Sequence, residues 1–311
     1  IGEKLLGIGD ALARVKERAR KLRAAQATRR CADASMITIV DLTLPMADEL
    51  RQQAQAYGVD PVVWVEVNEM WASTTNDNKH ESLPGYDAAE NAFMSRASFL
   101  SLRPCRELTD EVMNEMLYVL LAESPNIAGF NSYLFEKLRQ GLPRRKYFGK
   151  ATAGRKIGVE IEQVLAIRHV PGHWCLAGLS WAPQAQLYSD SMRQWYEERR
   201  AMAQLVDFVN AELRYHPPPQ GAQLDPRAFD HRRRGRQQPT APGCRNDCGV
   251  DVLLMVALCA HDPVRFFSRA DCGASLRVST PPLEMLRARA DFACRLLRPR
   301  GDDAQLARAR A

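Results

Sequence analysis

The stretch RNDCGVDVLLMVALC, residues 245–259, places a cysteine between a polar segment and a long apolar run. Asp247 precedes Cys248, and every residue after this cysteine is apolar except Asp251. A run of this length with a single charge predicts a buried, rigid helix that begins near the thiol. The first turn of a helix has unpaired N–H groups, which favour a thiolate over a thiol. We therefore expect Cys248 to act as a nucleophile.

A second Asp-Cys-Gly, residues 271–273, offers a comparison. The residues that follow it, ASLRVSTPP, have neither the length nor the pattern of a buried helix, so Cys272 is predicted to be an ordinary loop cysteine. The eight cysteines of the chain form no repeated CxxC pairs, and no histidine lies at a regular zinc-ligand spacing from them. We expect neither a disulfide framework nor a structural zinc site, and reduced thiols indicate the nucleus or the cytoplasm.

The composition is that of a globular protein. Apolar residues make up 46% of the 311 residues, which is enough for a substantial core in one large domain or two ordinary ones. No stretch has the length and apolar character of a membrane span, and no cleavable leader is visible, so we expect neither. The net charge of +6 is small and dispersed, which argues against direct nucleic-acid binding.

The first 96 residues are predicted to form an N-terminal extension. Residues 4–24 repeat apolar positions at steps of three and four among arginines and lysines, which predicts a basic amphipathic helix. Beyond it we expect two short strands, residues 36–45 and 60–67, around a helix over residues 46–57, and then a polar loop over residues 72–87.

Residues 97–300 are predicted to form a second domain, followed by a frayed tail over residues 301–311. Two helices come first, over residues 108–123, capped by Thr109, and 129–141. Three extended segments separated by Pro-Gly and Ala-Pro turns predict a small antiparallel sheet: residues 159–170, 173–181 and 184–191. The remaining elements are helices over residues 192–214, 249–260 and 281–297 and a long Pro- and Arg-rich surface loop, residues 215–244.

A cysteine nucleophile needs a base within hydrogen-bond reach and a third group that orients this base. His173 begins an alternating strand directly after the turn at residues 171–172, where a side chain can emerge at a sheet edge beside a helix N-terminus. Asp190 ends the next strand and can accept the imidazole N–H. These residues predict a triad in which His173 is the base, Asp190 orients it and Cys248 attacks.

These residues lie in segments that resemble the Ulp/SENP family of cysteine proteases, which cut SUMO and related ubiquitin-like proteins from their precursors and conjugates. The resemblance covers about residues 97–297 and rests on FNSYLFEKL (130–138), HVPGHWCLAGL (169–179), LYSDS (187–191) and NDCGVDVLLM (246–255). The family's catalytic His, Asp and Cys fall on His173, Asp190 and Cys248. The resemblance implies an α+β papain-like fold of the Ulp/adenain type. In this fold helices flank a small, mostly antiparallel sheet, and the nucleophile lies at the N-terminus of a buried central helix.

The resemblance also implies roles for three further residues. Trp174 would cover the narrow tunnel through which a Gly-Gly tail reaches the sulfur, because only glycines pass between close aromatic walls. Asp110 matches the last residue of the family's Trp-Leu-Asn-Asp and is expected to bind substrate. The family's oxyanion glutamine falls on Pro242, so Gln238 is the candidate in its place. Neither a metal nor an organic cofactor is implied.

The resemblance implies cleavage after the C-terminal glycine of a ubiquitin-like protein, with SUMO as the default and NEDD8 or ubiquitin left open. A binding module of the same fold, with weakened or no turnover, also stays open. It is favoured by Pro242, by Glu107 in place of the family's aromatic residue, and by Asp251 one turn past the nucleophile. An acyltransferase that shares the triad geometry would need a cofactor pocket, which no pattern indicates. The arginine run HRRRGR (231–236) is interpreted as a solvated loop rather than a nuclear signal or a contact with an acidic substrate.

Overall fold

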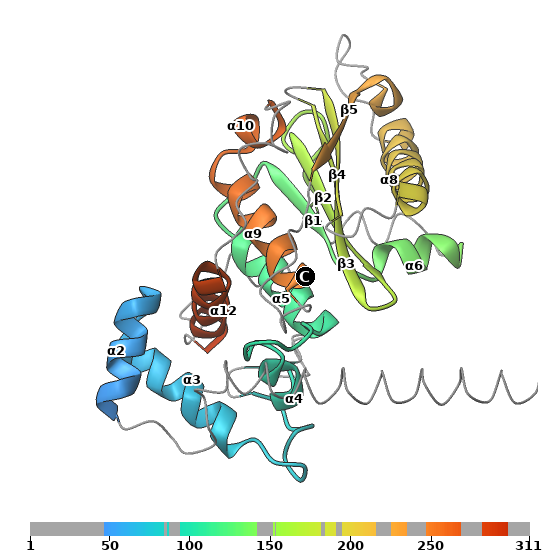
Figure 1. The fold of residues 1–311 in the computed structure, drawn as a ribbon. Coiled ribbons are helices and arrows are strands. Elements are labelled where there is room, and N and C mark those ends of the chain that lie inside the picture. The colour runs from blue at the N-terminus through green and yellow to red at the C-terminus, as the bar shows by residue number, and fades with distance from the viewer. Residues whose placement is uncertain are drawn as a thin grey trace, which may run out of the picture.

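The computed structural model describes residues 47–83, 86, 94–141, 152, 154–181, 184–190, 195–215, 225–234, 247–268 and 282–297 (Figure 1). The helix predicted over residues 4–24, the strand predicted over residues 36–45, Gln238, Cys272 and the tail over residues 301–311 lie outside these ranges. Within the described ranges, no helix has the length and apolar character needed to cross a membrane. The domain boundary at residue 96 stays a prediction.

A five-stranded mixed sheet lies at the centre of the fold, with helices on both of its faces (Figure 1). Its strands lie side by side in chain order: β1 (Ile127–Phe130), β2 (Gln163–Val170), β3 (His173–Ser180), β4 (Ala185–Ser189) and β5 (Asp230–Arg234). The strands β2, β3 and β4 pair antiparallel, as the three extended segments predict. Each edge adds a parallel strand, β1 beside β2 and β5 beside β4. Gly172, with a φ of 70°, turns the chain from β2 into β3, so that Val170 pairs with His173.

Helices form a layer on each face of the sheet. The helices α5 (Asp110–Leu121), α9 (Cys248–His261) and α10 (Pro263–Ser268) lie on one face, and α6 (Leu134–Arg139) and α8 (Trp195–Tyr215) lie on the other (Figure 1). The helix α12 (Pro282–Leu297) packs against α9 and also contacts α2 (Ala47–Tyr57) and α3 (Pro61–Ser73). The short α4 (Arg96–Leu100) contacts both α3 and α5. This arrangement confirms the predicted α+β class, with a small sheet flanked by helices.

Most of the predicted helices are confirmed to within a few residues. The patterns over residues 46–57, 108–123, 192–214, 249–260 and 281–297 correspond to α2, α5, α8, α9 and α12. Thr109 caps α5 as expected, because its side-chain oxygen accepts a hydrogen bond from the N–H of Val112 at 3.5 Å. These segments share an apolar period and a start or stop signal, and both are local properties of the sequence.

The strand predicted over residues 60–67 is wrong, because this segment is the first half of α3. Asp60 caps the helix by accepting a hydrogen bond from the N–H of Val62 at 2.9 Å, and Pro61 occupies the first turn, where no N–H is needed. The buried side chains of α3 recur every three or four positions, at Trp64, Val67, Asn68 and Trp71. The cap and the helical period therefore outweigh the β-branched valines.

Two further corrections concern the edge strands. The helix predicted over residues 129–141 is strand β1 followed by the shorter α6, and the loop predicted over residues 215–244 contains β5. At Gly129 a β-carbon would lie 2.6 Å from Leu121 Cδ1, so β1 passes too close to α5 for a side chain. The side chain of Asn131 then accepts a hydrogen bond from the N–H of Tyr133 at 3.2 Å and turns the chain out of the strand. Contacts of this kind, with segments distant along the chain, leave no local pattern.

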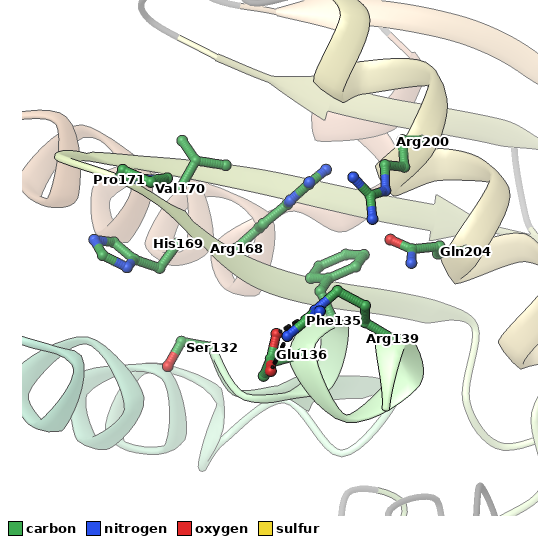
Figure 2. A pocket seen from close by; sticks show the side chains of 10 residues that line it. All are labelled: Ser132, Phe135, Glu136, Arg139, Arg168, His169, Val170, Pro171, Arg200 and Gln204. Carbon is green, nitrogen blue, oxygen red and sulfur yellow. Dashed lines mark hydrogen bonds and ion pairs between the residues drawn. The ribbon is translucent and has the colours of Figure 1, made fainter. Parts of the chain in front are cut away.

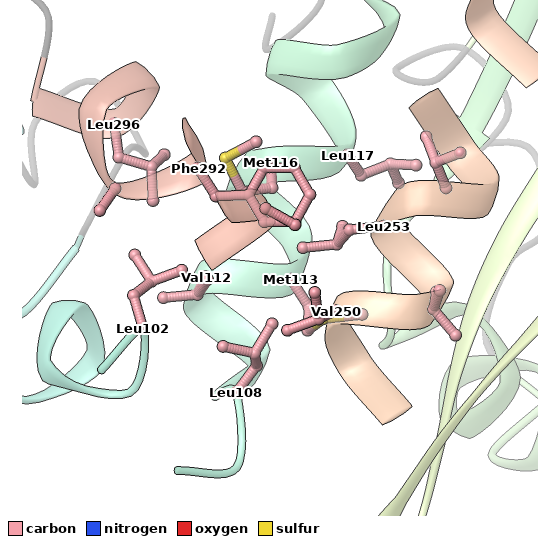
Figure 3. Close-up of a cluster of buried hydrophobic side chains, with 14 of the residues drawn as sticks. Leu102, Leu108, Val112, Met113, Met116, Leu117, Val250, Leu253, Phe292 and Leu296 are labelled. Carbon is pink, nitrogen blue, oxygen red and sulfur yellow. The ribbon is translucent and has the colours of Figure 1, made fainter. Parts of the chain in front are cut away.

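The main apolar core lies between the sheet and the helices α5, α9 and α12 (Figure 3). Side chains from these helices and from the loop before α5 meet there, among them Leu102, Leu108, Val112, Met113, Met116, Leu117, Val250, Leu253, Phe292 and Leu296. Residues of α2 and α3, such as Leu50 and Trp64, belong to the same core. A second core, on the other face of the sheet under α6 and α8, includes Phe130, Trp181 and Phe208.

A buried arginine of α12 joins three segments around the start of α9. Arg289 is 2% exposed, and its Nε and Nη2 atoms donate to Asp247 Oδ1 at 3.0 and 2.7 Å. The two Nη atoms also donate to the backbone oxygens of Ser101, Arg103 and Arg106, at 2.7 to 3.1 Å. One guanidinium therefore holds the residue before Cys248 against the loop that leads into α5.

Replacing Arg289 with alanine is expected to reduce the free energy of unfolding by about 3–5 kcal/mol, because Asp247 would keep a buried carboxylate without a counter-charge. Arg295→Ala is the matched control. Arg295 lies on the same helix in an exposed pair with Asp291, and its loss should cost less than about 0.5 kcal/mol. Urea denaturation followed by circular dichroism compares the two variants, and equal destabilisation would contradict the role given to Arg289.

Candidate functional site: a Cys-His-Asp cluster

Cys248 is the first residue of α9. The first backbone hydrogen bond of this helix runs from the N–H of Asp251 to the carbonyl oxygen of Asp247 at 2.9 Å. The side chain of Asp247 makes no capping hydrogen bond, and it binds Arg289 instead. The N–H groups of the first turn are therefore left without a side-chain cap, which favours a negative charge at this position. The structure thus places Cys248 where the sequence predicts a nucleophile.

Gly249 follows Cys248 for a steric reason. A β-carbon at this position would lie 3.1 Å from Leu108 Cβ, from Met113 Sδ and from Trp174 Cδ1. Contacts this short force the neighbouring atoms to shift, so the chain beside Cys248 passes directly against α5 and β3. The close approach explains why glycine occupies the last position of the Asp-Cys-Gly motif.

The sheet brings His173 and Asp190 into direct contact. The pairing of β3 with β4 reaches Leu176 and Ser189, and Asp190 comes one position later, beside the start of β3. His173 Nε2 lies 2.8 Å from Asp190 Oδ1. Both side chains are buried, with exposed fractions of 1% and 3%. The predicted base and the residue predicted to orient it are therefore hydrogen-bonded to each other.

The surroundings of His173 favour its charged form. Burial lowers the pKa of the imidazole, but hydrogen bonds with Asp190, Cys175 and Cys248 outweigh burial and raise the pKa of His173 to about 11. Asp190 engages Nε2, which leaves Nδ1 as the ring nitrogen that can exchange a proton with Cys248. The three predicted triad residues thus lie together, in an arrangement that can hold a thiolate beside an imidazolium.

Cys175 is a second thiol in this cluster, and the sequence patterns above do not single it out. It lies two positions after His173 on β3 and is fully buried. Ligand atoms of His173, Cys175 and Asp190 all lie within 4.8 Å of one another, a nitrogen, sulfur and oxygen set that can hold an ion such as Zn²⁺. The two-residue period of the strand is the signal that could have found Cys175. That the site works without a metal stays a prediction.

Trp174 is buried against the start of α9. Its Nε1 donates to the carbonyl oxygen of Leu108 at 3.0 Å, and its ring centroid lies 4.4 Å from that of His169. His169 Nε2 lies 3.9 Å from Glu107 Oε1, so the acidic residue that replaces the family's aromatic is close to the same rings. Trp174 is 2% exposed. Its role as the cover of a tunnel stays a prediction.

Asp110 and Gln238 are the other two predicted site residues. Asp110 begins α5, and the hydroxyl group of Tyr133 donates a hydrogen bond to its Oδ2 atom. Burial, and then this hydrogen bond, raise the pKa of Tyr133. Substrate binding by Asp110 stays a prediction. Gln238 lies outside the described residues, so its role as an oxyanion donor also stays a prediction.

Asp251 places a carboxyl group one turn past Cys248. Burial and the neighbouring Asp247 raise the pKa of Asp251 to about 6, from an ordinary value of 3.8, although His173 acts in the opposite direction. Because the pKa is higher in the folded state, the folded chain binds this proton more tightly than the unfolded chain does. The resulting stabilisation is complete below about pH 4 and is lost as the pH rises through 6.

Asp251→Asn removes this dependence, because asparagine does not titrate. We expect the variant and the parent to have similar stability near pH 4, and the variant to be more stable by about 1 kcal/mol above pH 7. Calorimetric melting at pH 4 and pH 7.5 measures the difference. Glu284→Gln, which changes an exposed carboxylate at the start of α12, is the control. A difference that is the same at both pH values would contradict the assignment.

No family model matches the chain, and no curated protein matches it in sequence. Among solved structures, the fold is similar to the Ulp1 protease domain in complex with Smt3, the yeast ortholog of SUMO. That match has a TM-score of 0.56 and 18% identity and covers 75% of this chain and 93% of the other. SUMO protease Ulp1 with its catalytic cysteine oxidised to a sulfonic acid matches with a TM-score of 0.54 and 18% identity, over 74% of this chain and 91% of the other. The Ulp1-like SUMO protease catalytic domain of Chaetomium thermophilum matches with a TM-score of 0.52 and 17% identity, over 76% and 89%. The chain therefore has the fold of an Ulp1-type protease domain.

Proposed function

We propose that the protein is a cysteine protease of the Ulp/SENP family that cleaves after the C-terminal glycine of a ubiquitin-like protein. The observation that carries this proposal is the hydrogen bond of 2.8 Å between His173 and Asp190, with Cys248 bonded to the same imidazole at the start of α9. The fold shared with Ulp1 supports it. SUMO is the proposed partner because the Ulp1 domain of similar fold was solved with Smt3.

In the proposed reaction, His173 takes the proton of the Cys248 thiol, and Asp190 holds the imidazole in the orientation that keeps Nδ1 available. The sulfur attacks the carbonyl carbon of the terminal glycine and forms a tetrahedral intermediate. The C–N bond then breaks, and the amine leaves with the proton held by His173. Water, deprotonated by His173, attacks the resulting thioester and releases the carboxylate of the ubiquitin-like protein and the free thiol.

Selectivity for a glycine tail is proposed to come from the crowding around Trp174. Leu108, Trp174 and Gly249 are in such close contact that Gly249 itself has no room for a β-carbon. A substrate backbone that enters beside them meets the same restriction, which tails without β-carbons satisfy. The backbone N–H of Cys248, and Gln238 if it reaches the site, would stabilise the oxyanion.

Covalent labelling separates a protease from a binding module of the same fold. A vinyl-sulfone probe built on SUMO should add its mass to the parent protein and to Cys259→Ala, which removes another buried thiol of α9, but not to Cys248→Ala. Probes built on NEDD8 and ubiquitin test the other partners. Failure of every probe to label the parent, together with measurable binding of one of these proteins, would favour the binding module.

Asp190→Asn tests the role of the carboxylate. We expect kcat to fall by about 100- to 10,000-fold, because the asparagine no longer stabilises the imidazolium or fixes its tautomer. Asp207→Asn is the matched control, since Asp207 lies on α8 in an exposed pair with Arg227 at 2.7 Å. Steady-state hydrolysis of a fluorogenic SUMO conjugate measures both variants. Equal kcat values for Asp190→Asn and the parent would contradict the proposed triad.

A further inference from the structure

A pocket of about 370 Å³ lies between α6, the end of β2 and α8, on the side of the sheet that carries the second core (Figure 2). Its charged and polar lining comes from three separate segments: Glu136 and Arg139 of α6, Arg168 and His169 of β2, and Arg200 and Gln204 of α8. Three guanidinium groups thus face one carboxylate around the same space. We call this feature the arginine pocket, after Arg139, Arg168 and Arg200.

The three arginines differ in how firmly they are held. Arg168 is 7% exposed, and its guanidinium lies 5.4 Å from the ring centroid of Phe135, so its position is fixed by packing. Arg139 donates from Nε and Nη2 to the carboxylate of Glu136 at 2.8 and 2.7 Å. Arg200 is exposed on α8 and makes no ion pair with any residue that the structure describes. Since Glu136 is already paired, the excess positive charge lies with Arg168 and Arg200.

The arginine pocket shares a hairpin with the proposed catalytic base. Val170 and Pro171 line the pocket, and Val170 pairs directly with His173 across the β2–β3 turn. A protein whose C-terminal tail reaches Cys248 therefore has its folded body within reach of the pocket. Guanidinium groups bind carboxylates in a fixed fork geometry, so the pocket is suited to an Asp or Glu side chain.

We propose that the arginine pocket binds an acidic side chain on the body of the ubiquitin-like partner and thereby selects among such partners. This inference rests on the proposed function, and it deepens it by assigning a specificity site outside the triad. A partner with an acidic residue at this point gains attraction, whereas a partner with a basic residue there is repelled.

Charge reversal at Arg200 tests the pocket with two substrates. One is a fluorogenic conjugate of whole SUMO, and the other is a short peptide with the same Gly-Gly tail and fluorophore. We expect Arg200→Glu to raise KM for the SUMO conjugate by about 5- to 30-fold at low salt, with kcat and peptide hydrolysis unchanged, because the pocket contacts only the body. The effect should shrink as salt is added.

Two further variants sharpen this test. Arg199→Glu makes the same charge change at the neighbouring exposed position of α8, which does not line the pocket, and should leave KM within about twofold of the parent. Glu136→Gln removes the carboxylate of the pocket and releases Arg139, so it should lower KM. If Arg200→Glu and Arg199→Glu change KM equally, or if Glu136→Gln raises KM, the pocket does not select the partner.

Binding to the Cys248→Ala protein keeps the two proposals apart. If the parent hydrolyses neither substrate, the proposed activity fails, but calorimetric titration of SUMO, NEDD8 and ubiquitin into Cys248→Ala still reports on the pocket. Weaker binding in Cys248→Ala/Arg200→Glu than in Cys248→Ala/Arg199→Glu would support the inference. Binding that is insensitive to Arg200→Glu while inorganic phosphate binds in an Arg200-dependent way would assign the pocket to a small anion and overturn it.

Discussion

The position of the candidate nucleophile depends on the buried pair of Arg289 and Asp247. Asp247 is the last residue before α9, and the guanidinium that binds it also holds the backbone of the loop before α5. A buried ion pair adds little net stability over apolar packing, but each partner makes the other indispensable. The pair therefore acts mainly as a positioning device. It fixes the start of one helix relative to another, and Cys248 lies in the space between them and the sheet.

The sheet supplies the rest of the candidate site through its geometry. The turn at Gly172 ends at His173, and the antiparallel partner strand delivers Asp190 to the same place. Neither side chain needs a loop to reach the other, so their contact is as rigid as the hydrogen bonds between β3 and β4. Because successive side chains alternate between faces, His173 and Cys175 share one surroundings while Trp174 packs against α9.

The triad residues could be predicted because each has a local signature: a helix start for Cys248, a strand start after a turn for His173 and a strand end for Asp190. The edge strands β1 and β5 could not, because their parallel partners are distant along the chain. Arg289 was equally hidden, since an arginine in an amphipathic helix normally marks the solvated face. The arginine pocket combines three segments whose charges have no relation in sequence. What was missed is therefore tertiary, and what was found is local.

The helix α12 sets the order in which this centre can be completed as the chain is made. A ribosome releases residues 173, 190 and 248 before residue 289, so a growing chain contains the sulfur, the imidazole and the carboxylate while Asp247 is still without its guanidinium. During that interval the start of α9 has no anchor against the loop before α5. The cluster therefore reaches its final geometry only when nearly the whole described chain has emerged, which couples the maturation of the site to the end of translation.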